Sequence, residues 1–479
     1  MAYRQGERRQ RCLFPESLDD YVGPEDPVRA YDAFVGALDL EALGIAWGPR
    51  QVGCPAYDPR VMLKILVYGY SYGIRSSRKL ERALHHNVSF MWLAGGLKPD
   101  FKTIARFRHD HRNALAGVLK QGARLCIKLN LIAGNTLFVD GSKFRGNVSL
   151  NNRWTVERCE RALARIDKRI ETLLAECDAV DAQEAQTGSL VKLEKTLSQQ
   201  QKLKTKVETA LKELQEENLD HVNTTDPEST SIHGRQGSHA GYNAQIVVDD
   251  QHGLIVHSDV VNDNNDLGQF ADQIDAANDT LEQPCQRACG DAGFSNAKVL
   301  EKIDAQGIEV IVPSAQQAQQ ARGQEPGPFD RSRFRYDAEA DAYVCPVGMS
   351  LPFRRIAGPK GRREYYPGRG RCSDCPHFGA CTTNETTGRK IVRHAHEALR
   401  AKLAAHYETP AAQAVFRRRK ENVELPFGHV KRNLGVDSFL LRGLAGVRAE
   451  MALLSSCFNL ARLISLVGVS ALVAKLLPS

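Results

Sequence analysis

The chain has 479 residues, more than one hydrophobic core usually holds, because single cores stop growing at about 250 to 300 residues. Its composition, 42% hydrophobic and 25% charged, is typical of a soluble globular protein, and no stretch has the order of a secretory signal. The net charge of +7 is a modest excess, which indicates a nucleic-acid partner only if the basic residues are clustered. Several modules and a cytosolic location are expected, and a disulfide framework is not, because disulfides are rare in the cytosol.

Residues 1–130 are predicted to be mostly helical, beginning with the basic arm "MAYRQGERRQR". Two apolar-periodic segments follow, separated by "GIRSS", in which a serine can cap the second helix. A further helix is predicted in "KPDFKTIARFRHDH", with Asp100 as its cap and with Arg106 and Arg108 on the helix. This module is predicted to bind DNA in a helix-turn-helix-like manner. The alternative is a helical bundle with charged outer faces.

A strand is predicted at 134–140, where an apolar run of β type ends in Asp140, and a mixed α/β core is expected to begin there. An insertion over 155–220 follows, in which apolar residues recur at spacings of three and four on both sides of the turn "QTGS". This pattern is typical of a coiled-coil hairpin, which would serve as a spacer, a DNA clamp or a dimer arm.

Strand patterns return at "GYNAQIVVDDQHGLIVHSDVV", which predicts an antiparallel hairpin, and at "CQRACGDAGFSNAKVLEKIDAQGIEVIVPS", which predicts strand, helix and strand. A linker rich in glutamine, glycine and proline leads to a cluster of cysteines, after which a helical pattern continues to the C-terminus. The last apolar stretch has only twelve residues between Arg462 and Lys475, short of the about 20 that a membrane span needs. A buried helix is therefore expected there.

The expected fold class is α/β, with a mixed sheet covered by helices, an N-terminal helical domain and two insertions. The predicted divisions are 1–130 for the N-terminal domain, 131–154, 221–320 and 386–479 for three parts of the catalytic core, 155–220 for the hairpin, and 321–385 for a zinc-ribbon-like insertion.

Three acidic residues are candidates for a metal site. Asp140 and Asp291 each follow a short strand pattern, and Glu424 lies in a helical stretch dense in arginine and lysine, with Lys431 two helical turns later. Each acid alone is most often a turn or cap residue. Together they are the oxygen ligands that two Mg²⁺ ions need to activate a water or hydroxyl and to stabilise a leaving oxygen in phosphodiester chemistry.

With these motifs, the sequence resembles the DDE transposases of bacterial insertion sequences, in the branch with a VE-x-PFG-x-x-K motif. The resemblance covers nearly the whole chain and rests on "YGYSYGIRSSRKLE", "PDFKTIARFRHDH", "FVDGSKFRGN", "TDPEST", "GYNAQIVVD", "GDAGFSN" and "VELPFGHVK". It implies a ribonuclease-H-like catalytic core in which Asp140, Asp291 and Glu424 form a triad that holds two Mg²⁺ or Mn²⁺ ions.

Phosphate contacts are expected from the basic residues near the triad and in the N-terminal module: Lys143, Arg145, Arg419, Lys420, Lys431, Arg106 and Arg108. One departure from the family pattern concerns the last motif. Counting from Glu424, Lys431 fits the family spacing, but Lys420 stands where related transposases have arginine, and Arg419 lies one residue earlier. Glu421 is the alternative third acid, although no lysine follows it at the same spacing.

Four of the twelve cysteines are grouped: Cys345 in "YVCPVGMSL", and Cys372, Cys375 and Cys381 in "GRCSDCPHFGACTT". The C-x-x-C pair is a knuckle suited to tetrahedral Zn²⁺, and Cys345 precedes it as in a zinc ribbon, so a structural zinc site with four thiolates is predicted. The alternatives are reduced thiols without a metal, His377 in place of one ligand, and an iron–sulfur cluster.

The resemblance implies a DNA transposase that binds double-stranded DNA at the terminal inverted repeats of its element, cleaves it and transfers the 3′ ends to target DNA. Two ends must be brought together, so a homodimer on DNA is expected, and no membrane partner is. Two other functions stay open: a transposase-derived DNA-binding regulator without catalysis, and a metal-dependent nuclease that does not join ends.

Overall fold

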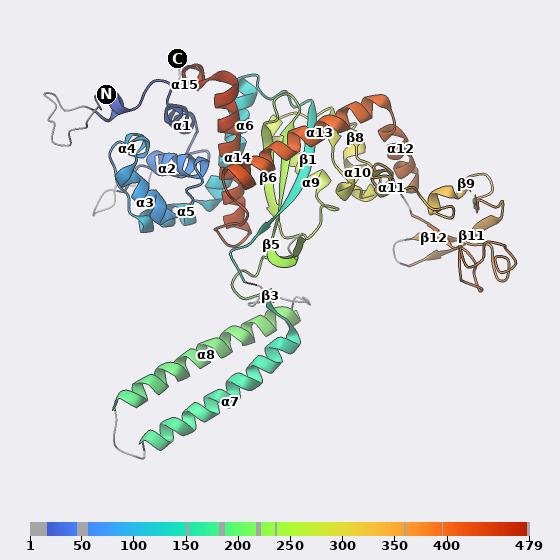
Figure 1. Ribbon diagram of the computed structural model, residues 1–479, viewed down its shortest axis with the longest axis horizontal. Helices are drawn as coiled ribbons and strands as arrows, with labels where there is room; N and C mark the ends of the chain where they lie inside the picture. Colours follow the sequence, from blue (N-terminus) through green and yellow to red (C-terminus); the bar gives the residue numbers. More distant parts are fainter. Residues whose placement is uncertain are drawn as a thin grey trace, which may run out of the picture.

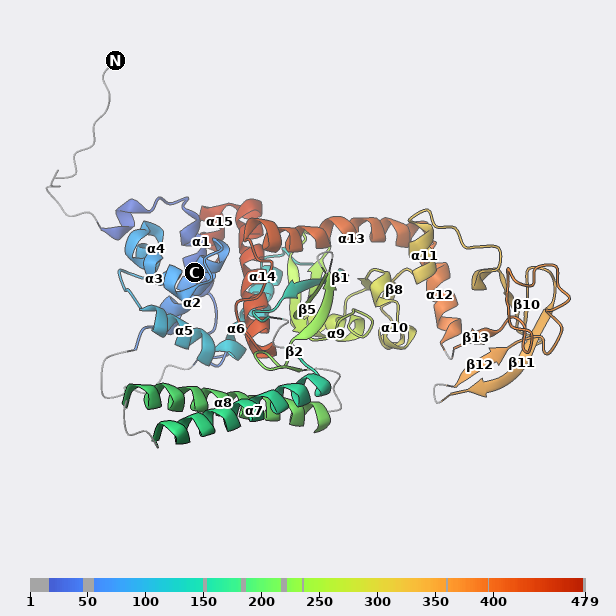
Figure 2. The ribbon, with the colours of Figure 1, turned by 60° about the horizontal axis from the view of Figure 1, so that its bottom comes forward.

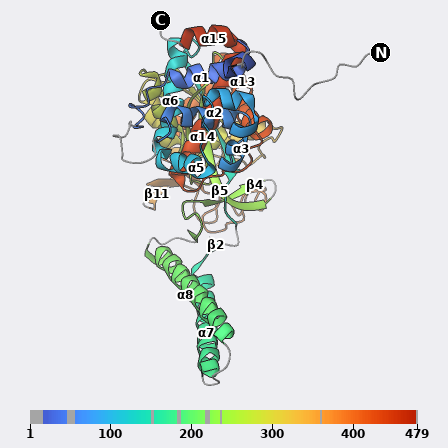
Figure 3. The same ribbon diagram turned by 90° about the vertical axis from the view of Figure 1, so that its left-hand side faces the viewer.

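The computed structural model describes residues 17–45, 56–149, 153–181, 187–216, 222–234, 237–358, 361–394 and 396–476, so the basic N-terminal arm lies outside the described part. Figure 1 shows a module of helices at one end, a central sheet, a small β module at the other end, and a long helical hairpin that projects from the middle. The hairpin also stands clear of the other elements in the perpendicular view of Figure 3.

The N-terminal region is helical over its described residues, as predicted. Its elements are the 3₁₀ turn η1 (Leu18–Tyr21) and the helices α1 (Pro27–Gly36), α2 (Pro59–Ser71), α3 (Ser77–His86), α4 (Val88–Leu93), α5 (Phe101–Asp110) and α6 (Arg112–Lys128). The predicted cap of α5 is confirmed, because the Asp100 carboxylate accepts a hydrogen bond from the backbone N–H of Thr103 at 2.6 Å. A proline in the first turn of α1 and of α2 fixes the backbone where each helix begins.

The central sheet is mixed, as predicted. Its strands are β1 (Thr136–Arg145), β4 (Thr230–Gly234), β5 (Gly237–Asp249), β6 (Ile255–Val261), β7 (Arg287–Cys289) and β8 (Glu309–Ile311). β5 is antiparallel to β1, β4 and β6, whereas β1 is parallel to β7 and β7 to β8. The predicted hairpin of β5 and β6 and the predicted strand, helix and strand of β7, α10 (Ala297–Asp304) and β8 are confirmed.

Helices cover the sheet and connect it to both ends of the molecule. They are α9 (Phe270–Leu281), α10, α11 (Ala315–Gln320), α12 (Glu397–Tyr407), α13 (Pro410–Gly428), α14 (Leu444–Val467) and α15 (Val469–Leu476). α13 contacts β1, β5 and β7, and Figure 2 shows it running along the sheet between α14 and α12. A helix from the last part of the chain therefore packs across three strands of the sheet.

The C-terminal helices belong to the core. α14 is long and apolar enough to span a membrane, but 67% of its apolar window is buried inside the protein, as in a core helix. The expected C-terminal helix is the end of α14 and α15, separated at Gly468, and it is buried along one face only, at Leu463, Val469, Leu472 and Leu476. One continuous hydrophobic core joins the N-terminal helices, the sheet and these C-terminal helices, so the N-terminal module packs directly onto the sheet.

Two insertions have hydrophobic cores of their own. The first leaves the sheet through β2 (Arg153–Trp154) and returns through β3 (Val222–Asn223), with α7 (Val156–Asp181) and α8 (Thr187–Glu216) forming an antiparallel pair around its own apolar seam. α8 begins at Thr187, so the residues predicted as a turn are partly helical. The second is an antiparallel sheet of β9 (Arg335–Asp337), β10 (Ala342–Val344), β11 (Ser350–Ala357), β12 (Arg362–Tyr365) and β13 (Ile391–Arg393), paired in chain order.

Candidate active site

Asp140 and Asp291 lie side by side because of the register of two parallel strands. β1 pairs with β7 up to Phe138 opposite Cys289, and each aspartate stands two residues beyond that pair. Residues two apart in a strand point to the same face. β7 ends at Cys289, whereas β1 continues beside β5 to Arg145. The prediction that the strand ends at Asp140 is therefore wrong: pairing with β5 extends β1, and Asp140 lies in its middle, next to the edge that β7 leaves open.

Arg419 joins the two aspartates from α13. This buried residue places Nη2 2.7 Å from Oδ1 of Asp140 and 3.8 Å from Oδ2 of Asp291. The guanidinium also donates to the carbonyl oxygen of Val139 at 3.4 Å. The sequence predicts a phosphate contact for Arg419, whereas the structure places it as the counter-charge of two carboxylates.

The environment of Asp140 makes its carboxyl group harder to ionise than an exposed one. Burial raises the pKa of Asp140 to about 6, Arg419 opposes that rise, and the negative charges of Asp291 and Asp266 add to it. The carboxylate of Asp291 is more exposed and accepts a hydrogen bond from the backbone N–H of Gly293 at 2.8 Å. The pair therefore combines one enclosed and one accessible carboxylate.

A third carboxylate, Asp266, lies beside this pair and was not predicted as a site residue. Its Oδ1 accepts hydrogen bonds from Nδ2 of Asn243 and Nε2 of Gln245, both at 2.7 Å. A Cβ on Gly141 would overlap the same oxygen. The sequence does contain a signal, because Asn243 and Gln245 are polar residues at alternate positions of an otherwise apolar strand pattern.

Glu424, the predicted third acid, is placed differently. Its side chain is exposed on α13, as is that of Glu421. Glu424 lies five positions after Arg419, which places its side chain about 140° around the helix from that of Arg419. The structure thus brings Asp140 and Asp291 together on Arg419 and leaves the Glu424 side chain exposed on another face of α13.

Lys431 lies on the same face of β1 as Asp140. It belongs to a π turn (η5, His429–Asn433) that follows α13, and its Nζ donates to Oγ of Ser142 at 2.6 Å and to the carbonyl oxygen of Lys143 at 3.2 Å. Burial lowers the pKa of Lys431, and the nearby charge of Asp140 opposes that effect. Such π turns are frequent at functional sites, and this one places the lysine beside the acidic pair.

The other predicted basic residues near the site have different environments. Lys143 donates its Nζ to the carbonyl oxygen of Asn264 at 2.6 Å, which ties the loop before α9 to β1. Arg145 ends β1, where its backbone bonds to the segment between η5 and α14. Lys420 is exposed on α13. Of these three, Arg145 and Lys420 are exposed and Lys143 is partly buried.

The two arginines predicted on α5 differ in exposure. Arg106 is exposed, whereas Arg108 is buried. Nη1 of Arg108 donates to the carbonyl oxygen of Arg75 at 2.8 Å and to the hydroxyl of Tyr70 at 3.3 Å. Arg108 therefore holds α2, α3 and α5 together, and only Arg106 is available at the surface.

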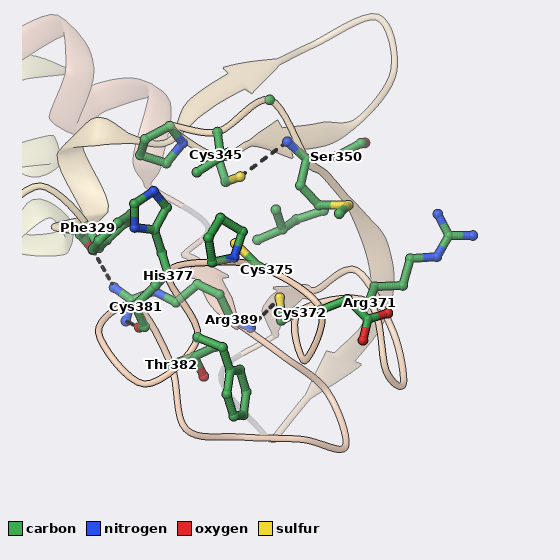
Figure 4. A pocket seen from close by; sticks show the side chains of 18 of the residues that line it. Phe329, Cys345, Ser350, Arg371, Cys372, Cys375, His377, Cys381, Thr382 and Arg389 are labelled. Atoms are coloured by element: carbon green, nitrogen blue, oxygen red, sulfur yellow. Dashed lines mark hydrogen bonds between the residues drawn. The ribbon is translucent and has the colours of Figure 1, made fainter.

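The four grouped cysteines line one cavity of about 870 Å³ in the β module, together with His377 (Figure 4). Sγ of Cys345 accepts a hydrogen bond from the backbone N–H of Met349 at 3.2 Å, and Sγ of Cys372 accepts one from that of Arg389 at 3.5 Å. Burial raises the pKa of Cys381, and the other three thiols raise it further. In the described part of the chain, no three histidine, cysteine or acidic side chains stand close enough to hold a metal ion as they are placed.

Comparison with known proteins gives two protein-family matches. A transposase domain (DUF772) matches residues 16–110, and a transposase DDE domain matches residues 344–464. The second match includes Glu424, whereas Asp140 and Asp291 lie outside both. No curated protein and no solved structure matches the chain. Because transposase domains match both its N-terminal helices and its C-terminal region, the chain is a DDE transposase of an insertion sequence, and hence an enzyme that acts as a DNA transposase.

Proposed function

We propose that this transposase binds the terminal repeats of its element, cleaves the DNA there and transfers the 3′ ends to target DNA, with Asp140, Asp291 and Glu424 as its catalytic acids. The observation that carries the proposal is the position of Asp140 and Asp291 at the open edge of β1, with the cations Arg419 and Lys431 beside them. Such an arrangement of carboxylates and cations suits the binding of divalent ions and of a phosphodiester.

The central sheet is proposed to be a ribonuclease-H-like core. In support, β1, β5 and β6 form a consecutive antiparallel set, α9 follows, and β7 and β8 then add in parallel on the other side of β1. Asp140 is on β1, the central strand of this order, and Asp291 follows the end of the parallel neighbour β7. In this proposal α7 and α8 are an insertion into the core, and the pair is a DNA clamp or a dimer arm.

The acidic pair fits Mg²⁺ or Mn²⁺ by its chemistry. Its donors are carboxylate oxygens, which these hard cations prefer, and the Asp291 side chain is about half exposed. Asp140 and Asp291 would hold the ions, with Glu424 as the third ligand that the family motif assigns. Two such ions activate an attacking hydroxyl or water and stabilise the leaving oxygen of a phosphodiester.

The roles of the basic residues follow from their exposure. Lys431, half-buried next to Ser142, is proposed to hold the scissile phosphate close to Asp140. Lys420 and Arg106 are exposed and are proposed to contact phosphates farther along the DNA. The expected partners are double-stranded DNA and a second copy of the chain in a homodimer. The expected location is the bacterial cytoplasm, which contains the DNA.

Cleavage of a DNA that carries the element ends, in the presence of Mg²⁺ or Mn²⁺, tests the catalytic acids. Asp140→Asn, Asp291→Asn and Glu424→Gln are expected to lower the rate of cleavage by about a hundredfold to a thousandfold, because each removes a group that stabilises the transition state through the metal ions. Glu421→Gln, also exposed on α13, is the matched control and should cleave like the wild type. Wild-type rates in Asp140→Asn would refute the site, and wild-type rates in Glu424→Gln alone would remove only the third acid.

We also propose a structural Zn²⁺ site in the β module. Support comes from the four cysteines, which line one cavity. Two of their sulfur atoms also accept hydrogen bonds from backbone N–H groups, and such bonds stabilise thiolates. The sulfur donor set suits Zn²⁺. Elemental analysis should find about one zinc per chain, and Cys372→Ser should lose it, whereas Cys285→Ser, which changes a buried thiol elsewhere, should keep it. Protein without zinc would contradict this site and leave the catalytic proposal unaffected.

A further inference from the structure

We propose that Asp266 is a further metal-binding carboxylate of this active site, held in position by Asn243 and Gln245. The inference rests on the proposed metal-dependent function and extends it, because the family motif assigns three other acids. Asp266 lies in the loop between β6 and α9, on no strand or helix of its own.

The two oxygens of Asp266 have different surroundings. Oδ1 accepts two hydrogen bonds from the fully buried amides of Asn243 and Gln245 on β5. Oδ2 accepts none between described residues and approaches Gly293: a Cβ there would lie 3.6 Å from it and 2.9 Å from Oδ1 of Asp291. A carboxylate anchored through one oxygen, with the other directed toward a second carboxylate, has the arrangement of a metal ligand with its supporting hydrogen bonds.

The supporting amides carry a second, independent sign of a ligand. Oδ1 of Asn243 and Oε1 of Gln245 are buried and have no hydrogen-bond partner in the described part of the chain, although both side chains are 0% exposed. Buried polar atoms are almost always paired, so two unpaired oxygens at alternate positions of one strand require an explanation. The water molecules of a hydrated divalent cation are donors that would pair with these oxygens.

The charge balance of the cluster points the same way. Asp140, Asp266 and Asp291 are three carboxylates, and Arg419 is the cation that bonds to the first and last of them. No ion pair of Asp266 occurs between described residues; its hydrogen-bond donors, Asn243 and Gln245, are neutral. Neutral donors hold the carboxylate in place and leave its charge uncompensated. Ionised together, the cluster has an excess of negative charge that a divalent cation would balance.

Glycines keep the space around Asp266 open. A Cβ on Gly141 would overlap Oδ1 of Asp266 and lie 2.6 Å from Nε2 of Gln245. Neither Gly141 nor Gly293 has a left-handed backbone, so at Gly141 the close approach of Asp266 and Gln245 is what disfavours a side chain. At Gly293 an added Cβ would lie 2.9 Å from Oδ1 of Asp291 and at ordinary contact distance from Asp266. The motifs "VDGS" and "DAGF" therefore each place a small residue next to a catalytic aspartate, and Asp266 fills the space that results.

Direct binding of Mn²⁺ to the full-length protein, measured by titration calorimetry without DNA, tests the proposal. Asp266→Asn keeps the size of the side chain and an acceptor oxygen for the two amides, but it removes the charge. Its affinity for Mn²⁺ is expected to be lower by about tenfold or more. Asp272→Asn, at an exposed position at the start of α9, is the matched control and should bind Mn²⁺ like the wild type.

Thermal unfolding in a chelator separates a metal ligand from a purely structural residue. If Asp266 is a ligand, the metal-free Asp266→Asn protein should unfold at the same or a higher temperature, because one of three neighbouring negative charges is gone. A lower unfolding temperature together with unchanged Mn²⁺ affinity would overturn the proposal and make Asp266 an anchor of its loop. If the wild type and Asp140→Asn alike bind no Mn²⁺, the metal-dependent function itself fails, which distinguishes the two failures.

Discussion

Single residues in the site are constrained by space as much as by charge. Gly141 follows Asp140 on β1, and the side chain of Asp140 faces α13. Because Gly141 has no side chain, the carboxylate of Asp266 and the amide of Gln245 can approach its backbone closely. A change at this position acts on the acids without altering any of them. It therefore tests whether the spacing of the carboxylates matters for catalysis.

Gly141→Ala is expected to lower both Mn²⁺ affinity and DNA cleavage by about tenfold or more, because the new methyl group must displace Asp266 or Gln245. The strain of overpacking should also reduce the free energy of unfolding by about 1 to 3 kcal/mol. Gly268→Ala, in the turn before α9, is the control, since nothing lies within 4 Å of its added Cβ. Equal activity in the two variants would show that the carboxylates tolerate a shift.

The positions of whole helices explain the role of the acidic motif "TDPEST". In "TDPEST", Asp226 accepts a hydrogen bond from the backbone N–H of Gly443 at 3.2 Å, and Glu228 accepts one from that of Leu444 at 2.8 Å. Both acids therefore satisfy free N–H groups where α14 begins. Their role is to attach the loop before β4 to the core helix, and they are separate from the acidic cluster.

The helical hairpin is an element that the sheet does not need for its own packing. β2 and β3 pair Arg153 with Asn223 and Trp154 with Val222, so the chain leaves and re-enters at adjacent points. Trp154 packs against the seam of the hairpin, and the guanidinium of Arg158 lies 5.0 Å from the centre of its ring. The tryptophan therefore stabilises the base of the insertion.

Replacing residues 155–221 with a short glycine-serine turn is expected to leave the rest of the molecule folded. The free energy of unfolding of the remainder should change by less than about 1 kcal/mol, because the hairpin has its own core. Urea unfolding and circular dichroism check this. As a control, Val207→Asp should disrupt the seam within the intact chain and unfold the hairpin alone. Loss of the whole fold in the replacement would show that the hairpin supports the sheet.

Across the whole molecule, distant parts of the sequence are joined by a buried ion pair. Arg75, between α2 and α3, places Nη1 2.6 Å from Oε1 of Glu450 on α14, whose side chain is 0% exposed. Glu450 also accepts the backbone N–H groups of Leu440 and Leu441. Burial raises the pKa of Glu450, and Arg75 opposes that rise. The N-terminal module is thereby fixed to the C-terminal helix that packs on the sheet.

Arg75→Met is expected to reduce the free energy of unfolding by about 3 to 5 kcal/mol at neutral pH, because it leaves a buried carboxylate without its partner. An acid whose pKa in the folded state is above that in the unfolded state loses stability as pH rises, so the loss should be smaller at pH 5 than at pH 8. Urea unfolding at both pH values measures it. Arg75→Met/Glu450→Gln should recover most of the loss, and Lys79→Met, an exposed control, should show none. A loss in Arg75→Met independent of pH would contradict this account.

Local sequence patterns predict most elements of this transposase and single out two candidate acids. The helix cap at Asp100, the β5–β6 hairpin, the β7–α10–β8 unit and the paired helices of the insertion all follow from short-range periodicity and capping chemistry. Asp140 and Asp291 are candidates because each follows a short strand pattern, and the resemblance to DDE transposases implies their place in the triad. The burial of Arg108 was not visible, because it depends on α2 and α3 packing against α5.

Tertiary structure alone decided which charged groups meet. The parallel register of β1 and β7 brings Asp140 to Asp291, although 150 residues of intervening chain separate them. The passage of α13 over the sheet places Arg419 on that pair and leaves Glu424 exposed. Asp266 joins them through buried amides of a neighbouring strand. Such contacts depend on long-range strand pairing and helix packing, which a local sequence pattern does not predict. The residue types that make the chemistry possible can be read from the sequence itself.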